Sequence, residues 1–258
     1  MIASAMIGNV VCDLDGVVYR GSEPVPGSAT ALAALDAAGW KIIFSTNNSA
    51  RTPEEVAGRI GSITGYDAQP EQVITSAAAA ADLLSESKPR TFVLGGVGVT
   101  AALEKEGIPV TRVGSEAGAV VVGLATALTY DWLREASAAV MRGARLVATN
   151  DDPTFPAEDG LWPGAGSILA AVERASGVQA EVAGKPFPPM RRLIHKRLGP
   201  GPVWVVGDRP DTDLALAAAE PGWRSALVLT GVSAGQNLDL SPDLVASDLA
   251  EVARILLG

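Results

Sequence analysis

The sequence predicts an α/β protein with a largely parallel sheet flanked by helices, and with a second α/β segment inserted into the first. Three observations support this. Short apolar runs alternate with helix-like segments, polar residues gather behind the runs in the first and last parts of the chain, and the middle has an alternation of its own. Alternation of this kind is typical of parallel sheets, because each parallel strand needs a crossover that is usually a helix.

Seven apolar runs are expected to form strands, at 10–12, 41–45, 91–94, 119–123, 145–148, 203–207 and 226–230. Eight segments are expected to form helices, at 28–38, 53–60, 71–85, 100–106, 130–142, 167–175, 189–198 and 212–219. The chain is expected to cross between domains near Thr75 and near Gly184. Residues 1–77 and 182–258 would then form the core domain, and residues 78–181 the inserted domain.

Composition limits the function classes. Hydrophobic residues make up 48% of the 258 residues, enough for a sizeable core, while the net charge of −9 argues against a surface that binds nucleic acid. The lone Cys12 lies in the first apolar run, so a buried residue and a reducing cytoplasm are expected. No signal peptide or membrane span is expected, because the start lacks basic residues and the longest apolar stretch is too short.

Two carboxylates one residue apart, Asp13 and Asp15, directly follow the first apolar run. Ligands of open α/β sheets bind outside the carboxyl ends of the strands, where loops present polar groups. Because side chains alternate along a strand, both acids would leave on one face with Leu14 opposite. A purely structural Asp-rich turn would have the same composition. The segment is therefore either a reaction centre or a structural turn, and only other parts of the chain can distinguish the two.

Three further segments place polar groups behind apolar runs. The apolar run at 41–45 is followed by Thr46 and Asn47, which can bind anionic oxygens but would also suit a plain helix cap. The apolar run at 203–207 is followed by a segment with Asp208 and Asp213, whose oxygens are ligands of the kind that Mg²⁺ prefers. An Asp-rich helix cap has the same composition. Lys185 lies between a glycine and a proline, and by itself a lone lysine indicates little.

In order and content, these four segments resemble the motifs of the haloacid dehalogenase superfamily, specifically its p-nitrophenyl-phosphatase-like subgroup with a large α/β cap. The motifs are DLDGVVYRG at 13–21, STNNS at 45–49, GKP at 184–186 and GDRPDTD at 207–213. The segment ATNDD at 148–152, with Pro156, Gly160 and PGAG at 163–166, is similar to the cap of these phosphatases. The resemblance covers essentially the whole chain. It implies a Rossmann-like parallel-sheet core domain with an inserted α/β cap domain.

The resemblance implies a phosphomonoesterase that works through an aspartyl-phosphate on Asp13. Asp15 would act as general acid and then as general base, and Lys185 would supply a fixed positive charge beside the phosphate. Mg²⁺ would be the cofactor, held by Asp13, by the Asp15 carbonyl and by Asp208, with Asp213 in a second layer. A carboxylate nucleophile suits this chemistry, because it splits one difficult hydrolysis into two easier transfers.

For the substrate, the resemblance implies that Thr46 and Asn47 bind phosphoryl oxygens and that the inserted domain covers the core site. The cap loop 150–156 would set substrate choice, with Asn150 and Asp152 as candidate substrate-binding residues, although Asp152 serves equally well as a turn residue. The expected substrate is glycerol 3-phosphate or a similar small polyol phosphate. The alternatives are 2-phosphoglycolate, pyridoxal phosphate and nucleotides, and homodimers through the cap are common among such proteins.

Two interpretations from other classes stay open. Residues 92–100 contain a strand, a glycine-rich turn and a helix start, as in a dinucleotide-binding oxidoreductase, but the third glycine of that fingerprint and the acid that should follow are missing. A catalytically silent module that binds a phosphate ligand can be built on the same fold, since fold does not fix function. The presence of Asp13, Asp15 and Lys185 together argues against the silent module.

Overall fold

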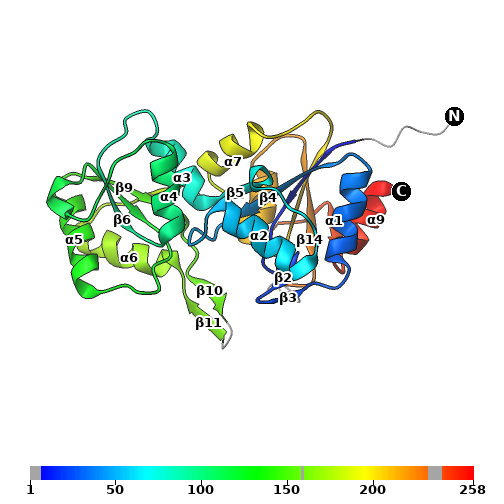
Figure 1. Ribbon diagram of the computed structural model, residues 1–258, viewed down its shortest axis with the longest axis horizontal. Coiled ribbons are helices and arrows are strands. Elements are labelled where there is room, and N and C mark those ends of the chain that lie inside the picture. Colours follow the sequence, from blue (N-terminus) through cyan, green and yellow to red (C-terminus); the bar gives the residue numbers. More distant parts are fainter. Residues whose placement is uncertain (1–6, 158–159, 232–239) are drawn as a thin grey trace. The chain divides into compact units, whose positions relative to one another are not determined.

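The computed structural model describes residues 7–157, 160–231 and 240–258, and the chain divides into two compact units (Figure 1). The first, here called the core unit, comprises Met1–Ser45, Glu54–Ile74 and Arg191–Gly258. The second, here called the cap unit, comprises Thr46–Pro53 and Thr75–Met190. The chain thus passes between the two units several times.

A six-stranded sheet with the order β15-β14-β13-β1-β4-β5 forms the base of the core unit. Its strands are β1 (Asn9–Cys12), β4 (Lys41–Thr46), β5 (Val73–Thr75), β13 (Val203–Gly207), β14 (Trp223–Val228) and β15 (Leu244–Ala246). β1 is parallel to both of its neighbours, β13 and β4. All four residues of β1 are buried, as expected for a central strand that is covered on both faces.

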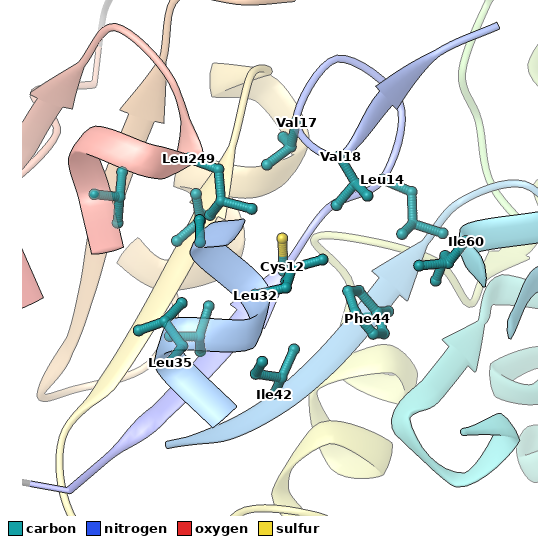
Figure 2. Packing of buried hydrophobic residues seen from close by; sticks show 14 of the residues in the cluster. Cys12, Leu14, Val17, Val18, Leu32, Leu35, Ile42, Phe44, Ile60 and Leu249 are labelled. Atoms are coloured by element: carbon teal, nitrogen blue, oxygen red, sulfur yellow. The ribbon is translucent and has the colours of Figure 1, made fainter. Parts of the chain in front are cut away.

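The helices of this part of the chain are α1 (Ser28–Ala37), α2 (Pro53–Thr64), α7 (Pro188–His195), α8 (Ala215–Ala218) and α9 (Leu249–Leu257), with helical turns η1 (Pro70–Gln72) and η3 (Pro210–Leu214). Figure 2 shows how α1 packs on the sheet. Leu32 and Leu35 of α1 belong to one fully buried cluster with Cys12 of β1 and Phe44 of β4. The expected burial of Cys12 is confirmed. A short antiparallel hairpin, β2 (Tyr19–Arg20) and β3 (Glu23–Pro24), follows β1.

The cap unit has its own sheet with the order β12-β9-β8-β6-β7, in which all neighbours are parallel. Its strands are β6 (Thr91–Leu94), β7 (Val110–Thr111), β8 (Ala119–Val122), β9 (Arg145–Ala148) and β12 (Glu181–Val182). Its helices are α3 (Ser76–Leu84), α4 (Val97–Lys105), α5 (Tyr130–Met141), α6 (Ala165–Ser176) and the turn η2 (Gly114–Glu116). A hairpin of β10 (Thr154–Ala157) and β11 (Gly160–Pro163) stands apart from this sheet.

The predicted class, α/β with parallel sheets, is confirmed, and the strands expected at 91–94, 145–148 and 203–207 match β6, β9 and β13. The helix expected over 71–85 is wrong in its first part. Residues 73–75 form β5, and α3 begins only at Ser76, after Thr75 has accepted the capping hydrogen bond from the Ala78 N–H. Three β-branched residues in a row favour a strand there. Within the described residues, no helix has the length and apolar character needed to cross a membrane.

Candidate active site

Asp13 and Asp208 lie close together because the strands that precede them are parallel neighbours. Asp13 directly follows β1 and Asp208 directly follows β13. Cys12 is paired with Val206, and the Asp13 N–H donates a hydrogen bond of 2.9 Å to the Val206 carbonyl. Both acids therefore stand at the carboxyl edge of the core sheet, the edge where open α/β sheets bind ligands.

A third carboxylate joins them from the turn after β13. Asp213 lies in η3, and its Oδ2 accepts a hydrogen bond of 3.2 Å from the Arg209 N–H. One oxygen from each of Asp13, Asp208 and Asp213 lies within 4.8 Å of the other two. Asp208 and Asp213 are only 2% and 1% exposed. Carboxylates this close repel one another, and a bound cation removes the repulsion.

Asp211, from the same segment, lies outside this acidic cluster. Arg209 donates to it twice, from Nη2 at 2.7 Å and from Nε at 3.2 Å. Burial raises the pKa of the Asp211 carboxyl, but the hydrogen bonds and charge of Arg209 outweigh that effect and hold the pKa below its ordinary value. Asp211 is therefore an ion-pair partner that fixes the side chain of Arg209.

Two glycine backbones approach the Asp208 carboxylate very closely. A Cβ added to Gly231 would lie 1.8 Å from Asp208 Oδ2, and one added to Gly16 would lie 2.7 Å from the same oxygen. The Gly16 carbonyl in turn accepts a hydrogen bond of 2.5 Å from the Thr230 hydroxyl. The loops that carry Gly16 and Gly231 thus hold Asp208 in place without any side chain on these two residues.

Asp15 is carried by a tight turn. The Leu14 carbonyl accepts hydrogen bonds of 2.9 to 3.2 Å from the N–H groups of residues 17–19. Leu14 is buried in the core (Figure 2), whereas Asp13 and Asp15 on either side of it are partly exposed. The side chains therefore alternate as the sequence predicts, with the two acids directed away from the core.

Tyr19 and Arg59 adjoin this turn, and neither was predicted from the sequence. Tyr19 forms an isolated bridge with Asp15, and its ring is buried. Burial raises the pKa of the Tyr19 phenol above its ordinary value, and the charge of Asp15 raises it further. Arg59 of α2 lies over the Tyr19 ring, 5.2 Å from its centroid, and donates a hydrogen bond to the Gly21 carbonyl. Helix α2 thus braces the hairpin beside Asp15, and no pattern in its sequence signals that contact.

Thr46 and Asn47, at the end of β4, belong with Lys185 to the cap unit. All three side chains are buried. The Thr46 hydroxyl accepts a hydrogen bond of 3.0 Å from the Asn48 N–H. Asn47 Oδ1 accepts from the Lys185 N–H at 2.8 Å, and Asn47 Nδ2 donates to the Lys185 carbonyl at 3.2 Å. The structure thus brings together two predicted site residues that are 138 positions apart.

The two predicted cap residues, Asn150 and Asp152, also meet at Asn47. Asn150 Nδ2 donates to the Asn47 carbonyl at 2.6 Å, and Asn47 Nδ2 donates to Asp152 Oδ2 at 3.1 Å. Further along the same loop, the Phe155 ring packs edge-on against Trp162, with 6.2 Å between the centroids. The polar start of the loop is therefore attached to Asn47, and its aromatic part belongs to the β10–β11 hairpin.

The glycine-rich turn before α4 is packed against the protein's own chain. The Gly98 N–H donates to the Ala50 carbonyl at 3.2 Å, and a Cβ on Gly98 would lie 2.6 Å from the Ser49 carbonyl oxygen. A dinucleotide-binding turn instead keeps this space for a pyrophosphate. Close packing within the cap unit therefore explains the glycines, and the dinucleotide interpretation loses its only support.

Comparison with known proteins agrees with this geometry. The family model of haloacid dehalogenase-like hydrolases matches residues 10–109, and a second, HAD-hydrolase-like model matches residues 182–252. An acid sugar phosphatase from Staphylococcus aureus is 36% identical over 246 residues, which cover 93% of this chain and 94% of that protein. The ranges matched by the two family models include all four motifs.

Solved structures match over both units. The p-nitrophenyl phosphatase from Archaeoglobus fulgidus has a TM-score of 0.86 and 31% identity, covering 96% of this chain and 98% of its own. A glycerol phosphate phosphatase from Mycobacterium tuberculosis, in complex with magnesium, has a TM-score of 0.87 and 33% identity, covering 98% of this chain and 79% of its own. The chain therefore belongs to the haloacid dehalogenase-like hydrolases and is an enzyme of their phosphatase group.

Proposed function

We propose that this enzyme uses Mg²⁺ to hydrolyse a small organic phosphate through an aspartyl-phosphate on Asp13. The observation that carries the proposal is the acidic cluster, in which Asp13 comes within 4.8 Å of Asp208 and Asp213. Three carboxylates alone would repel a phosphate dianion, so their convergence at the ligand-binding edge of the sheet is useful only with a cation. The magnesium in the Mycobacterium tuberculosis phosphatase supports the choice of ion.

The residues present fit Mg²⁺, which binds hard oxygen ligands and is usually held by one or two carboxylates together with waters and substrate phosphate. We assign Asp13, the Asp15 carbonyl and Asp208 as its ligands. We assign Asp213 to a second layer around the ion, because one of its oxygens already accepts from the Arg209 N–H. When bound, the ion neutralises charge on the phosphoryl group and its surroundings.

Asp13 and Asp15 then divide the reaction between them. A carboxylate oxygen of Asp13 attacks phosphorus, the ester P–O bond breaks, and the departing alkoxide takes a proton from Asp15. In the second step a water oxygen attacks the same phosphorus, its proton goes to Asp15, and the bond to Asp13 breaks. Inorganic phosphate leaves, and both acids return to their starting states.

We assign Lys185 and Thr46 to the phosphoryl oxygens, as the family's motifs imply. Two like unit charges 4 Å apart repel by about 4 kcal/mol at an effective dielectric constant of about 20, so a carboxylate that attacks a phosphate dianion needs positive charge beside it. The Lys185 ammonium supplies a charge of that sign, and the Thr46 hydroxyl supplies a neutral donor. We assign both to the equatorial oxygens of the transferring group.

We propose a primary phosphate ester of a small polyol or sugar as the substrate, with glycerol 3-phosphate as the first candidate. The matched relatives named acid sugar phosphatase and glycerol phosphate phosphatase support this class. Asn150 and Asp152 are hydrogen-bonded to Asn47, so we assign them to fixing the start of the cap loop. Residues 153–156, further along the loop, are then the candidates for contact with the leaving group.

A panel of phosphomonoesters tests this function. It should include glycerol 3-phosphate, a hexose phosphate, 2-phosphoglycolate, pyridoxal phosphate, nucleoside monophosphates and p-nitrophenyl phosphate, each assayed with Mg²⁺ and with a chelator. We expect Mg²⁺-dependent hydrolysis with the highest kcat/KM for polyol or sugar phosphates. Asp13→Asn should abolish turnover at an unchanged Tm, and Mg²⁺-dependent activity in that variant would contradict the proposal. Phosphate binding without any turnover would favour the silent module.

A further inference from the structure

The oxygen and both N–H donors of the Asn47 side chain are hydrogen-bonded within the cap unit. Its single oxygen accepts from the Lys185 N–H, and its amide nitrogen, which has two N–H donors, donates to the Lys185 carbonyl and to Asp152 Oδ2. Both polar groups of the Lys185 main chain are therefore paired with one side chain. A group with both donors engaged has none left for a phosphoryl oxygen.

The main chain of Asn47 is held by two other side chains. Its carbonyl accepts two hydrogen bonds, from the Ser76 hydroxyl at 2.7 Å and from Asn150 Nδ2 at 2.6 Å, and both are buried. A carbonyl oxygen has two lone pairs, so these donors fill it. Asn47 thus joins its own segment to three others, which contain Ser76, residues 150–152 and Lys185. These bonds fix the position of the amide that pairs with Lys185.

Gly184 allows this pairing to be so close. A Cβ on Gly184 would lie 2.5 Å from Asn47 Oδ1 and 2.6 Å from the Thr149 carbonyl oxygen. Any side chain at position 184 would therefore push Lys185 away from Asn47. The glycine before the lysine and the asparagine after the threonine belong to one arrangement, although they come from separate motifs.

We propose that Asn47 is a positioning residue for Lys185, fixing the main-chain point from which the lysine side chain extends, and that its side chain does not bind the substrate. The inference rests on the proposed function, because it takes Lys185 as the cation that binds the phosphoryl group. A long, flexible lysine stem loses less entropy on binding when its root is already fixed, so the pairing favours a productive position of the ammonium group.

Asn47→Asp tests the proposal with almost no change in shape. The variant loses both N–H donors and places a second carboxylate beside Asp152, 3.1 Å from its Oδ2. We expect kcat/KM to fall roughly 100-fold, the loss associated with a misplacement of about 1 Å. Asn48→Asp is the matched control, because the Asn48 side chain is exposed and its Oδ1 accepts a hydrogen bond from the Ala50 N–H, which an aspartate retains. The control should behave like the wild type.

A double-mutant cycle separates positioning from direct binding. The readout is the Kd for inorganic phosphate in the presence of Mg²⁺, measured by calorimetry, so that inactive variants are still informative. We expect Asn47→Asp to weaken phosphate binding in the wild type but to change it by less than about threefold in a Lys185→Met background, because coupled residues are not additive. The same loss in both backgrounds would show that Asn47 binds phosphate directly, and would overturn the proposal.

A second background separates positioning from mere stability. In Asp152→Asn, the added Asn47→Asp change no longer sets two carboxylates against each other, so Tm should be close to that of Asp152→Asn alone. Phosphate binding should still be weaker than in Asp152→Asn, because the Lys185 carbonyl has lost its donor. The inference would be overturned if the double variant matched Asp152→Asn in both Tm and phosphate binding. It would also be overturned if Asn47→Asp bound phosphate as tightly as the wild type. A wild-type protein that neither binds nor hydrolyses phosphate would instead refute the proposed function.

Discussion

Gly231→Ala should damage the proposed metal site without adding a charge or removing a ligand. Gly231 is not among the described glycines with positive φ, so an alanine meets no backbone strain there. The added Cβ would lie 1.8 Å from Asp208 Oδ2, whereas ordinary contact begins at 3.4 Å. Either the Asp208 carboxylate or the 231 loop must therefore shift by about 1.6 Å, taking these two distances as the limits.

A shift of this size is large for a catalytic ligand, because a misplacement of about 1 Å can cost roughly 100-fold in rate. We therefore expect kcat/KM to fall by about that factor at saturating Mg²⁺. The Mg²⁺ concentration that gives half-maximal turnover should rise about 10- to 100-fold, the usual cost of disturbing the support of a metal ligand.

The assay combines a Mg²⁺ titration of turnover with thermal unfolding at increasing Mg²⁺. A ligand at 100 times its Kd stabilises the folded state by about 2.7 kcal/mol, so Mg²⁺ should raise the Tm of the wild type and raise that of Gly231→Ala much less. Gly58→Ala is the control, because a Cβ at Gly58 in α2 has open space around it. It should gain about 0.5–1 kcal/mol in stability and keep the wild-type response to Mg²⁺. A wild-type Mg²⁺ requirement and turnover in Gly231→Ala would show that Gly231 does not hold Asp208 in its metal-binding position.

Two further predictions concern charged residues. Lys185→Met should lower kcat/KM at least about 100-fold, because it removes the positive charge assigned to the phosphoryl group, while Tm changes little; near-normal turnover with p-nitrophenyl phosphate would contradict this. Glu181→Gln should lower the Tm at pH 7 slightly, because Arg145 holds the Glu181 carboxylate with bonds of 2.6 and 2.7 Å. The hydrogen bonds from Arg145 hold the pKa of the Glu181 carboxyl below its ordinary value. The stability that the pair contributes is therefore present above the pKa of the unfolded state and is lost as the pH falls through the pKa of the folded state. Melting curves across this range should converge, and a Tm difference that persists in acid would count against the assignment.

The acidic cluster could be expected from the sequence because local patterns place its residues at the ends of strands. Asp13 and Asp208 each come directly after an apolar run, and parallel strands bring their carboxyl ends to one edge of a sheet. The alternation that buries Leu14 between two acids is likewise a property of the strand itself. These features depend on a few neighbouring residues, so they can be read without knowing the fold.

The contacts around Asn47 and Arg59 depend on tertiary packing, and no local pattern specifies them. The bonds from Asn47 to Lys185 join residues 138 positions apart, and Arg59 contacts Tyr19 from a different element. β5 was missed for a related reason. It has only three residues and is followed at once by a strong alanine-rich helix, so the helical pattern masks it.

A rapid acid quench of the enzyme during turnover tests whether the phosphoryl group is transferred to Asp13. Peptide mass spectrometry of the quenched protein should find one phosphoryl group, on the peptide that contains Asp13 and Asp15, with fragmentation assigning it to Asp13. The signal should be absent from Asp13→Asn. With p-nitrophenyl phosphate, whose leaving group needs no proton from Asp15, it should accumulate in Asp15→Asn, because hydrolysis of the intermediate lacks its base. A phosphoryl group on any other residue, or full turnover with no phosphorylated enzyme at any quench time, would contradict the account.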